Sequence, residues 1–132
     1  MIDTVVKPRQ GNLDPKLKAL LGDETHPKKG YIYCAACSHI ISHIDQRIEV
    51  NGSHDHNFVN PHGYRFHVGC FAQALGCAIS GRPQAADSWF PGFEWRIASC
   101  EECQSHLGWF FATADAQASS FYGLVTDRIQ SE

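Results

Sequence analysis

The chain has 132 residues and a hydrophobic content of 43%, which fits one globular domain and excludes wholesale disorder. Its formal net charge of −3 argues against nucleic-acid binding, which needs clustered Lys and Arg. No apolar run approaches the roughly 20 residues of a membrane span, and no secretory signal pattern opens the chain. We therefore expect a cytoplasmic protein with no nucleic-acid partner and no membrane partner.

Residues 1–29 are predicted to form a polar, partly ordered leader. Within it the stretch LDPKLKALLG carries a short helix signal, since Asp14 suits the N-cap, Pro15 the first helical position and Gly22 the stop. Residues 30–132 are then predicted to form the main domain.

From Tyr31 onward the pattern becomes strand-like. The runs YRFHVG (64–69) and FEWRIA (93–98) alternate apolar and polar residues, and SFYGLVTDRI (120–129) is aromatic and β-branched. Gly123 inside the last run marks a close-packing point, and CFAQALG (70–76) is predicted to form a short helical turn. Turn signals such as NGSHD, NPHG, SGRPQ and FPGF separate the runs. Together these features predict an all-β, antiparallel fold.

Six cysteines without a signal peptide favour metal or redox chemistry over disulfides. Four of them form two CxxC pairs, Cys34 with Cys37 and Cys100 with Cys103, and two such turns complete a tetrahedral zinc site. The gap between the pairs far exceeds that of a compact zinc ribbon, so a structural Zn2+ would clamp two ends of the domain. A thioredoxin-like redox role expects a βαβ context that the sequence does not show.

Histidines offer two further alternatives for metal binding. His39 and His106 lie just beyond the cysteine pairs and could substitute as ligands, although four cysteines already fill a site. The run SHDH (53–56) could also bind a metal, but it suits a solvated turn better. We expect His62 and His67 to serve as turn or strand residues.

The three tryptophans lie near the second cysteine pair. Trp89 and Trp95 flank a Pro-Gly turn, and Trp109 follows Cys103 by six residues. One interpretation is a core built from large side chains. The other is an aromatic cage near loops, which would hold a cation through its π faces or a flat neutral ring edge-on. The spacing does not choose between these ligands.

The ordered motifs VNPHGYRFHV, GRP, SWFPGFEW, CEECQSHLGWFF and FYGL resemble the thalidomide-binding (CULT) domain of the cereblon family. The resemblance covers about residues 31–129. It implies a β-tent fold, in which two antiparallel sheets are pinned together by a zinc ion held by four cysteines. The chain is most similar in scope to stand-alone bacterial versions of the domain. It has no room for cereblon's Lon-like domain or for the helical region that docks on a ubiquitin ligase, so we expect no such adaptor region.

The resemblance also implies a pocket for cyclic imides. Three tryptophans wall it, Phe111 closes its back, and the family's Asn-Pro rim falls on Asn60 and Pro61. The imide N–H and one carbonyl would be held by the Asp87 carbonyl and the Trp89 amide, in the segment that enters SWFPG. The implied ligand-binding residues are Asn60, Pro61, Asp87, Ser88, Trp89, Trp95, Trp109 and Phe111.

The sequence departs from the family at one pocket position. Human-type domains carry a histidine directly before SW that can donate to the second imide carbonyl, whereas this chain has Asp87 there. An ionised carboxylate cannot donate a hydrogen bond. The ligands that the resemblance implies are cyclic imides such as glutarimides, uracil- or uridine-like rings, and protein termini that bear a cyclic imide.

Two alternative functions remain open. The zinc-pinned scaffold also resembles B-type methionine sulfoxide reductases, whose chemistry needs a nucleophilic thiolate, and only Cys70 and Cys77 are free for it. Both lie in an apolar setting, which raises a thiol's pKa and favours an inert cysteine. The other alternative is a methyl-ammonium reader with Glu94 or Asp87 as counter-charge. We expect a binding module with no catalytic residues.

Overall fold

The computed structural model describes residues 4–7, 29–114 and 119–131. These residues contain eleven strands and two short 3-10 turns, and no α-helix is found among them. The fold is therefore all-β, as the alternating runs predict. The helix predicted to start near Asp14 lies outside the described residues. No helix in the described parts of the chain is long and apolar enough to cross a membrane.

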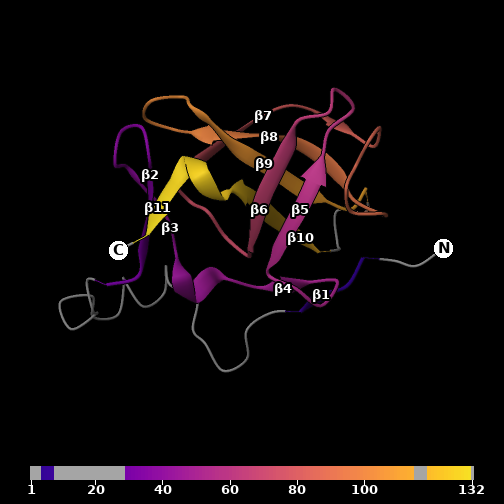
Figure 1. Cartoon of the computed structure of the whole chain (residues 1–132), viewed down its shortest axis with the longest axis horizontal. Coiled ribbons are helices and arrows are strands. Elements are labelled where there is room, and N and C mark those ends of the chain that lie inside the picture. The colour runs from indigo at the N-terminus through magenta and orange to yellow at the C-terminus, as the bar shows by residue number, and fades with distance from the viewer. Residues whose placement is uncertain (1–3, 8–28, 115–118, 132) are drawn as a thin grey trace.

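The largest sheet has six antiparallel strands (Figure 1). In spatial order they are β5 (Asp55–Val59), β6 (Arg65–Phe71), β10 (Ser120–Val125), β9 (His106–Ala112), β8 (Glu94–Cys100) and β7 (Cys77–Gln84). The two predicted alternating runs thus fall on β6 and β8. Tyr64 is the exception: it is 67% exposed, because β6 begins one residue after it.

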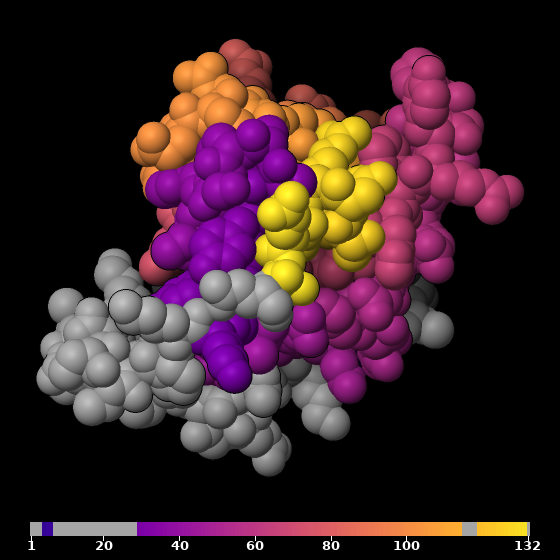
Figure 2. All heavy atoms as spheres, turned by 60° about the vertical axis from the view of Figure 1, so that its left-hand side comes forward, coloured from indigo at the N-terminus to yellow at the C-terminus, as the bar shows by residue number. Residues whose placement is uncertain are grey.

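A three-stranded antiparallel sheet packs beside the large one. Its order is β11 (Ile129–Ser131), β2 (Tyr31–Cys34) and β3 (Ile40–His43). The run 120–129 does not form one strand, because the 3-10 turn η3 (Thr126–Arg128) ends β10 and carries the chain across to β11. Figure 2 shows the resulting neighbourhood, in which the segment around residues 30–45 and the C-terminal strand lie next to each other and beside the segment near residue 105.

A two-stranded ribbon completes the architecture and uses part of the predicted leader. Strand β1 (Val6–Lys7) pairs with β4 (Glu49–Val50), which follows the 3-10 turn η2 (Ile44–Gln46). The start of the main domain at residue 30 stays a prediction.

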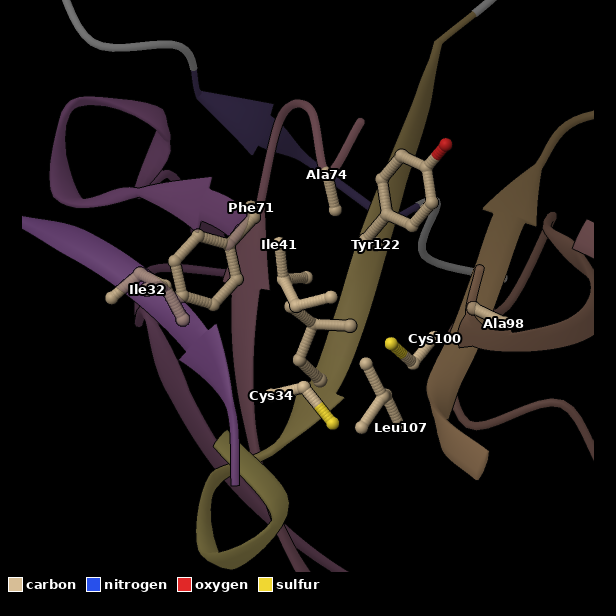
Figure 3. Close-up of a cluster of buried hydrophobic side chains, with 10 residues drawn as sticks. Ile32, Cys34, Ile41, Phe71, Ala74, Ala98, Cys100, Leu107 and Tyr122 are labelled. Atoms are coloured by element: carbon tan, nitrogen blue, oxygen red, sulfur yellow. The ribbon is translucent and has the colours of Figure 1, made fainter. Parts of the chain in front are cut away.

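The large sheet has a hydrophobic core on each face. Side-chain alternation along β10 sends Tyr122 and Leu124 to one core and Phe121 to the other. The first core, drawn in Figure 3, fills the space between the two sheets and includes Cys34 and Cys100, whose side chains project from facing strands toward Leu107. The second core is aromatic and contains Ile48, Val50, Cys70, Phe90, Phe93, Phe111 and Phe121. After its exposed first residue, Ser120, strand β10 is therefore buried on both faces, which accounts for its run of apolar and aromatic residues.

The stretch CFAQALG does not form the predicted helical turn. Its first two residues end β6, and the remainder is a tight connection in which Cys77 N–H donates to the Ala74 carbonyl at 3.0 Å. The connection packs closely, because a Cβ on Gly76 would collide with the backbone of Ile40 and lie 2.7 Å from the Cα of Ile41. Contact with β3 thus overrides the local helical pattern.

Two glycines let the central strands approach each other. A Cβ on Gly108 would collide with the backbone carbonyl of Gly123 and lie 2.9 Å from the Cα of Leu124. A Cβ on Gly123 would lie 2.8 Å from Cγ1 of Val68 and 3.0 Å from Cε2 of Phe111. Gly123 is therefore a close-packing point, as predicted.

These contacts predict a graded loss of stability. Gly108→Ala meets backbone atoms that cannot give way and should lower the free energy of unfolding by at least about 1–3 kcal/mol, the usual range for overpacking. Gly123→Ala meets only side chains and should cost less. Urea unfolding of both variants beside the parent measures the difference. An equal loss in the two variants would contradict the backbone contact at Gly108.

Candidate functional site

The two CxxC turns have the same backbone geometry. The first joins β2 to β3 and the second joins β8 to β9. In each, the residue after the second cysteine has a positive φ, 67° at Ser38 and 66° at Gln104. The N–H of each of these residues donates to the carbonyl of the first cysteine of its pair, at 2.8 Å in both turns. The chain therefore presents two matching thiol pairs, one from each sheet.

The four thiols converge on one point. Their sulfur atoms all lie within 4.8 Å of one another, and they belong to Cys34, Cys37, Cys100 and Cys103. The pairs Cys34–Cys103 and Cys37–Cys100 are each 3.6 Å apart between Sγ atoms. A tetrahedral site with metal–sulfur bonds of about 2.3 Å requires sulfur atoms about 3.8 Å apart. The cluster can therefore hold a metal ion, and its donor set fits zinc.

The neighbouring histidines have other partners. His39 Nε2 lies 2.7 Å from Oε2 of Glu101 and links the two cysteine turns. His106 Nε2 lies 2.9 Å from the Gly108 carbonyl, and its Nδ1 lies 3.4 Å from an Arg128 nitrogen. Because a carbonyl only accepts and a guanidinium only donates, His106 is the neutral tautomer with its proton on Nε2. Burial also lowers the pKa of His106.

The two remaining thiols are held in their protonated form. Burial raises the pKa of Cys70 to about 12, with a smaller contribution from the charge of Asp55. Burial likewise raises the pKa of Cys77 to about 12, with smaller contributions from the charges of Cys100, Glu101 and Cys34. A nucleophilic cysteine needs the opposite shift. Neither thiol lies in the lining of the aromatic cavity described next.

A cavity of about 190 Å3 lies among the tryptophans. Its lining consists of Asn60, Pro61, Asp87, Trp89, Trp95, Trp109 and Phe111. Seven of the eight residues that the resemblance implied are thus brought together. The eighth, Ser88, lies outside the lining, and its hydroxyl donates instead to the Phe90 carbonyl at 3.2 Å.

Trp89 and Trp109 form a corner of the cavity. Their rings meet edge to face, with centroids 4.8 Å apart and planes at 78°. Trp89 comes from the loop between β7 and β8, whereas Trp109 is in β9. Phe111, two residues further along β9, is buried at the back of the cavity. The two indoles therefore offer perpendicular faces to a single small space.

Trp95 forms a further wall from strand β8. Its indole N–H donates to the Ala86 carbonyl at 2.8 Å, which ties β8 to the loop that carries Asp87. Asp87 itself has a φ of 60°, a left-handed conformation that aspartate, asparagine and histidine adopt more readily than other non-glycine residues. The left-handed backbone at residue 87 therefore places the carboxylate at the cavity, and aspartate adopts this conformation readily.

Asn60 and Pro61 form the opposite rim, at the turn between β5 and β6. The Asn60 side-chain oxygen accepts from the backbone N–H groups of His62 and Tyr64, at 3.0 and 2.9 Å. Asn60 thus organises its own turn, as asparagine does in Asx turns. Its amide nitrogen is the donor that remains for a ligand.

A second layer of aromatic side chains supports the tryptophans, and sequence reasoning missed it. Phe58 stacks on Trp89 with centroids 4.6 Å apart and planes 8° apart. Phe66 contacts both Trp89 and Trp109, and the His106 ring meets Trp109 at 90°. The alternation in HNFVN and YRFHV places both phenylalanines on one face of their strands. That signal could have found them.

The run SHDH forms no metal site among the described residues. His56 Nε2 lies 2.9 Å from the Val50 carbonyl, and His54 Nδ1 lies 3.2 Å from the Ile48 carbonyl. His67 lies 3.6 Å from the carboxylate of Asp55. His56 thus links β5 to β4, and the run SHDH leads into β5 instead of forming a wholly solvated turn.

Comparison with known proteins finds similarity to protein cereblon from several animals. The chain is 41% identical to protein cereblon of Xenopus tropicalis over 75 residues, which are 55% of this chain and 17% of that protein. It is 42% identical to protein cereblon of Gallus gallus over 69 residues, 51% of this chain and 16% of that protein. The match to protein cereblon of Drosophila persimilis has 28% identity over 103 residues, 74% of this chain and 17% of that protein.

The chain thus spans about a sixth of the length of the curated relatives that it matches. No family model matches it. The expected likeness to stand-alone bacterial versions of the domain stays a prediction.

The cysteine cluster predicts that the fold depends on metal. Metal binding at such sites contributes about 10–16 kcal/mol, which is comparable to the whole stability of a domain. Chelation should therefore abolish cooperative thermal unfolding, and Cys34→Ser should lose the metal in elemental analysis. Cys77→Ser is the matched control and should keep one ion per chain. A metal-free protein with an undiminished melting transition would refute the prediction.

Proposed function

We propose that this chain, which is similar to protein cereblon over part of its length, is a zinc-containing binding module whose three-tryptophan cavity takes cyclic imides. The observation that carries the proposal is the cavity itself, since three indoles and an Asn-Pro rim from four separate chain segments meet around one space. Its volume of about 190 Å3 is below the roughly 300–1,000 Å3 of pockets for drug-sized ligands. That size suits one six-membered ring.

The open hydrogen-bonding groups at the cavity support a ring with an imide pattern. Among the described residues, neither the Asp87 carbonyl nor the Trp89 N–H has a hydrogen-bond partner. A cyclic imide presents one N–H between two carbonyls, so its N–H can donate to Asp87 and one carbonyl can accept from Trp89. Glutarimides, uracil-like rings and protein termini that end in a cyclic imide share this pattern.

We assign the metal as structural zinc. Four cysteine thiolates in a tetrahedron leave no coordination position open for a substrate, which is the hallmark of structural rather than catalytic zinc sites. The ion would hold the start of β9 and the end of β8, the two strands that carry Trp109 and Trp95. It therefore supports the cavity from a distance.

The alternatives draw less support from the same residues. A reductase needs a thiolate at the cavity. Cys70 is buried and Cys77 is half-buried, both thiols have a raised pKa, and neither is in the cavity lining. A methyl-ammonium reader would use the Asp87 carboxylate beside the indoles. That function leaves the open Trp89 N–H without a role, because an ammonium group has no lone pair and cannot accept a hydrogen bond.

The cage predicts that one indole can be removed without loss of the fold. Trp95→Ala should weaken binding of a fluorescent glutarimide by about five- to 150-fold, since stacking on one aromatic ring is worth about 1–3 kcal/mol per base. The zinc content should not change. Phe110→Leu is the matched control, because Phe110 neighbours Trp109 on β9 but packs against Tyr122 in the other core.

Fluorescence titration measures both variants against the parent. Intact affinity in Trp95→Ala would return the tryptophans to a purely structural role. Equal losses in Trp95→Ala and Phe110→Leu would show that general destabilisation, not the cage, governs binding.

Replacing Asp87 with a hydrogen-bond donor is predicted to raise the affinity for a cyclic imide. The second imide carbonyl would face this side chain. A carboxylate can only accept hydrogen bonds, so it would repel the carbonyl oxygen. Asp87→His and Asp87→Asn both supply a donor and both tolerate the positive φ. One net hydrogen bond is worth about 0.5–1.5 kcal/mol, so each variant should bind a glutarimide several-fold more tightly near neutral pH.

Calorimetric titration of the three proteins with the same glutarimide tests this. Equal affinities would mean that the side chain points away from the ligand. Weaker binding by both variants would mean that the assumed orientation of the ring is wrong.

A further inference from the structure

The turn between Trp89 and Trp95 leaves one carbonyl available to another part of the chain. Phe93 N–H donates to the Phe90 carbonyl at 3.0 Å, and Gly92 has a φ of 89°, as a type II turn requires. The hydrogen bond of the turn therefore involves no atom of Pro91. The Pro91 carbonyl lies at the tip of the loop that carries the cavity walls and can accept from elsewhere.

Thr4, near the start of the sequence, donates two hydrogen bonds to this carbonyl. Its hydroxyl donates to the Pro91 carbonyl at 2.6 Å, and its backbone N–H points to the same oxygen at 3.3 Å. The two residues are separated by 87 positions, so no local chain preference explains the contact.

The segment behind Thr4 is anchored independently. Val5 N–H donates to Oδ1 of Asn51 at 2.9 Å, and Asn51 N–H donates to the Val5 carbonyl at 2.7 Å. Val6 then pairs with Val50 in the β1–β4 ribbon and packs against the aromatic core that includes Phe90. Residues 4–7 thus connect two turns, one at Asn51 and the other at Pro91.

We propose that Thr4 is a positioning residue for the cavity and that residues 4–7 fasten the loop 85–93. The indole of Trp89 precedes Pro91 by two residues, and Asp87 precedes it by four, so a fixed Pro91 restricts the loop that bears the open hydrogen-bonding groups. A loop that is already ordered does not have to be ordered by the ligand, which raises affinity. For its effect on ligand affinity the inference rests on the proposed function.

The test uses the full chain with Thr4→Val, which keeps the shape of the side chain and removes the hydroxyl donor. Thr4→Ser is the matched control, because it keeps the donor. Loss of one net hydrogen bond corresponds to about a two- to twelve-fold change in an equilibrium. Thr4→Val should therefore bind a fluorescent glutarimide more weakly by that factor, while Thr4→Ser should match the parent.

A second measurement needs no ligand. Hydrogen exchange of the backbone amides in 85–93 should quicken by a similar factor in Thr4→Val, with exchange in β9 and β10 unchanged. Asn51→Gly should show the same local effect. It keeps the left-handed backbone of Asn51, which has a φ of 54°, but removes the side-chain acceptor for Val5.

The outcomes separate this inference from the proposed function. A parent protein that fails to bind glutarimide refutes the proposed function, and the exchange measurement then decides the fastening role by itself. Parent-like exchange in Thr4→Val overturns the inference. So does faster exchange throughout the domain, which would show a general structural role, or a defect in Thr4→Ser equal to that in Thr4→Val.

Discussion

Four thiols that meet between two sheets are the contact on which the rest of the structure depends. The three-stranded sheet buries its apolar side chains, Ile32 and Ile41, in the core that it shares with the large sheet. Here it is joined to the large sheet by the cysteine cluster and by the core that surrounds Cys34 and Cys100. Two of the thiols belong to this buried core and two lie at the surface, so a metal ion there would extend the core rather than replace it.

The two faces of the large sheet have different roles. One face packs toward the cysteine cluster, and the other carries the aromatic core and the cavity. Strands β8 and β9 serve both, because each has an end at the second cysteine turn and each contributes an indole to the cavity. The register between them, in which Trp95 pairs with Phe111 and Ile97 with Trp109, fixes the indoles relative to each other.

Local sequence patterns predicted the strands β6 and β8, the four cysteines as a group and the close packing at Gly123. They succeeded because alternation and CxxC spacing reflect interactions within a few residues. The gathering of Asn60 and Pro61 with the tryptophans came from the resemblance to the cereblon family and not from spacing. No local rule states that β5 lies near the loop after β7, yet the stacking of Phe58 on Trp89 depends on that arrangement.

Other features were beyond sequence reasoning because distant contacts decide them. The stretch CFAQALG has a helical pattern, but the approach of Gly76 to Ile40 imposes a tight connection instead. The run 120–129 reads as one strand, although η3 divides it between two sheets. Thr4 lies in a polar leader with no signal of its own, and only the fold brings it to Pro91.

The supporting layer behind the tryptophans has a consequence for how any ring would enter. Each indole already has a neighbour that fixes its orientation: Phe58 for Trp89, the His106 edge for Trp109, and the Ala86 carbonyl for Trp95. Immobilising a side chain on binding usually costs about 0.5–1.5 kcal/mol, and here folding has already met that cost. A ligand the size of one ring makes few contacts, so its affinity depends strongly on walls that are already rigid. The same rigidity limits the size of the ligand, because a bulky substituent pointing at a wall would have to displace two aromatic layers instead of one.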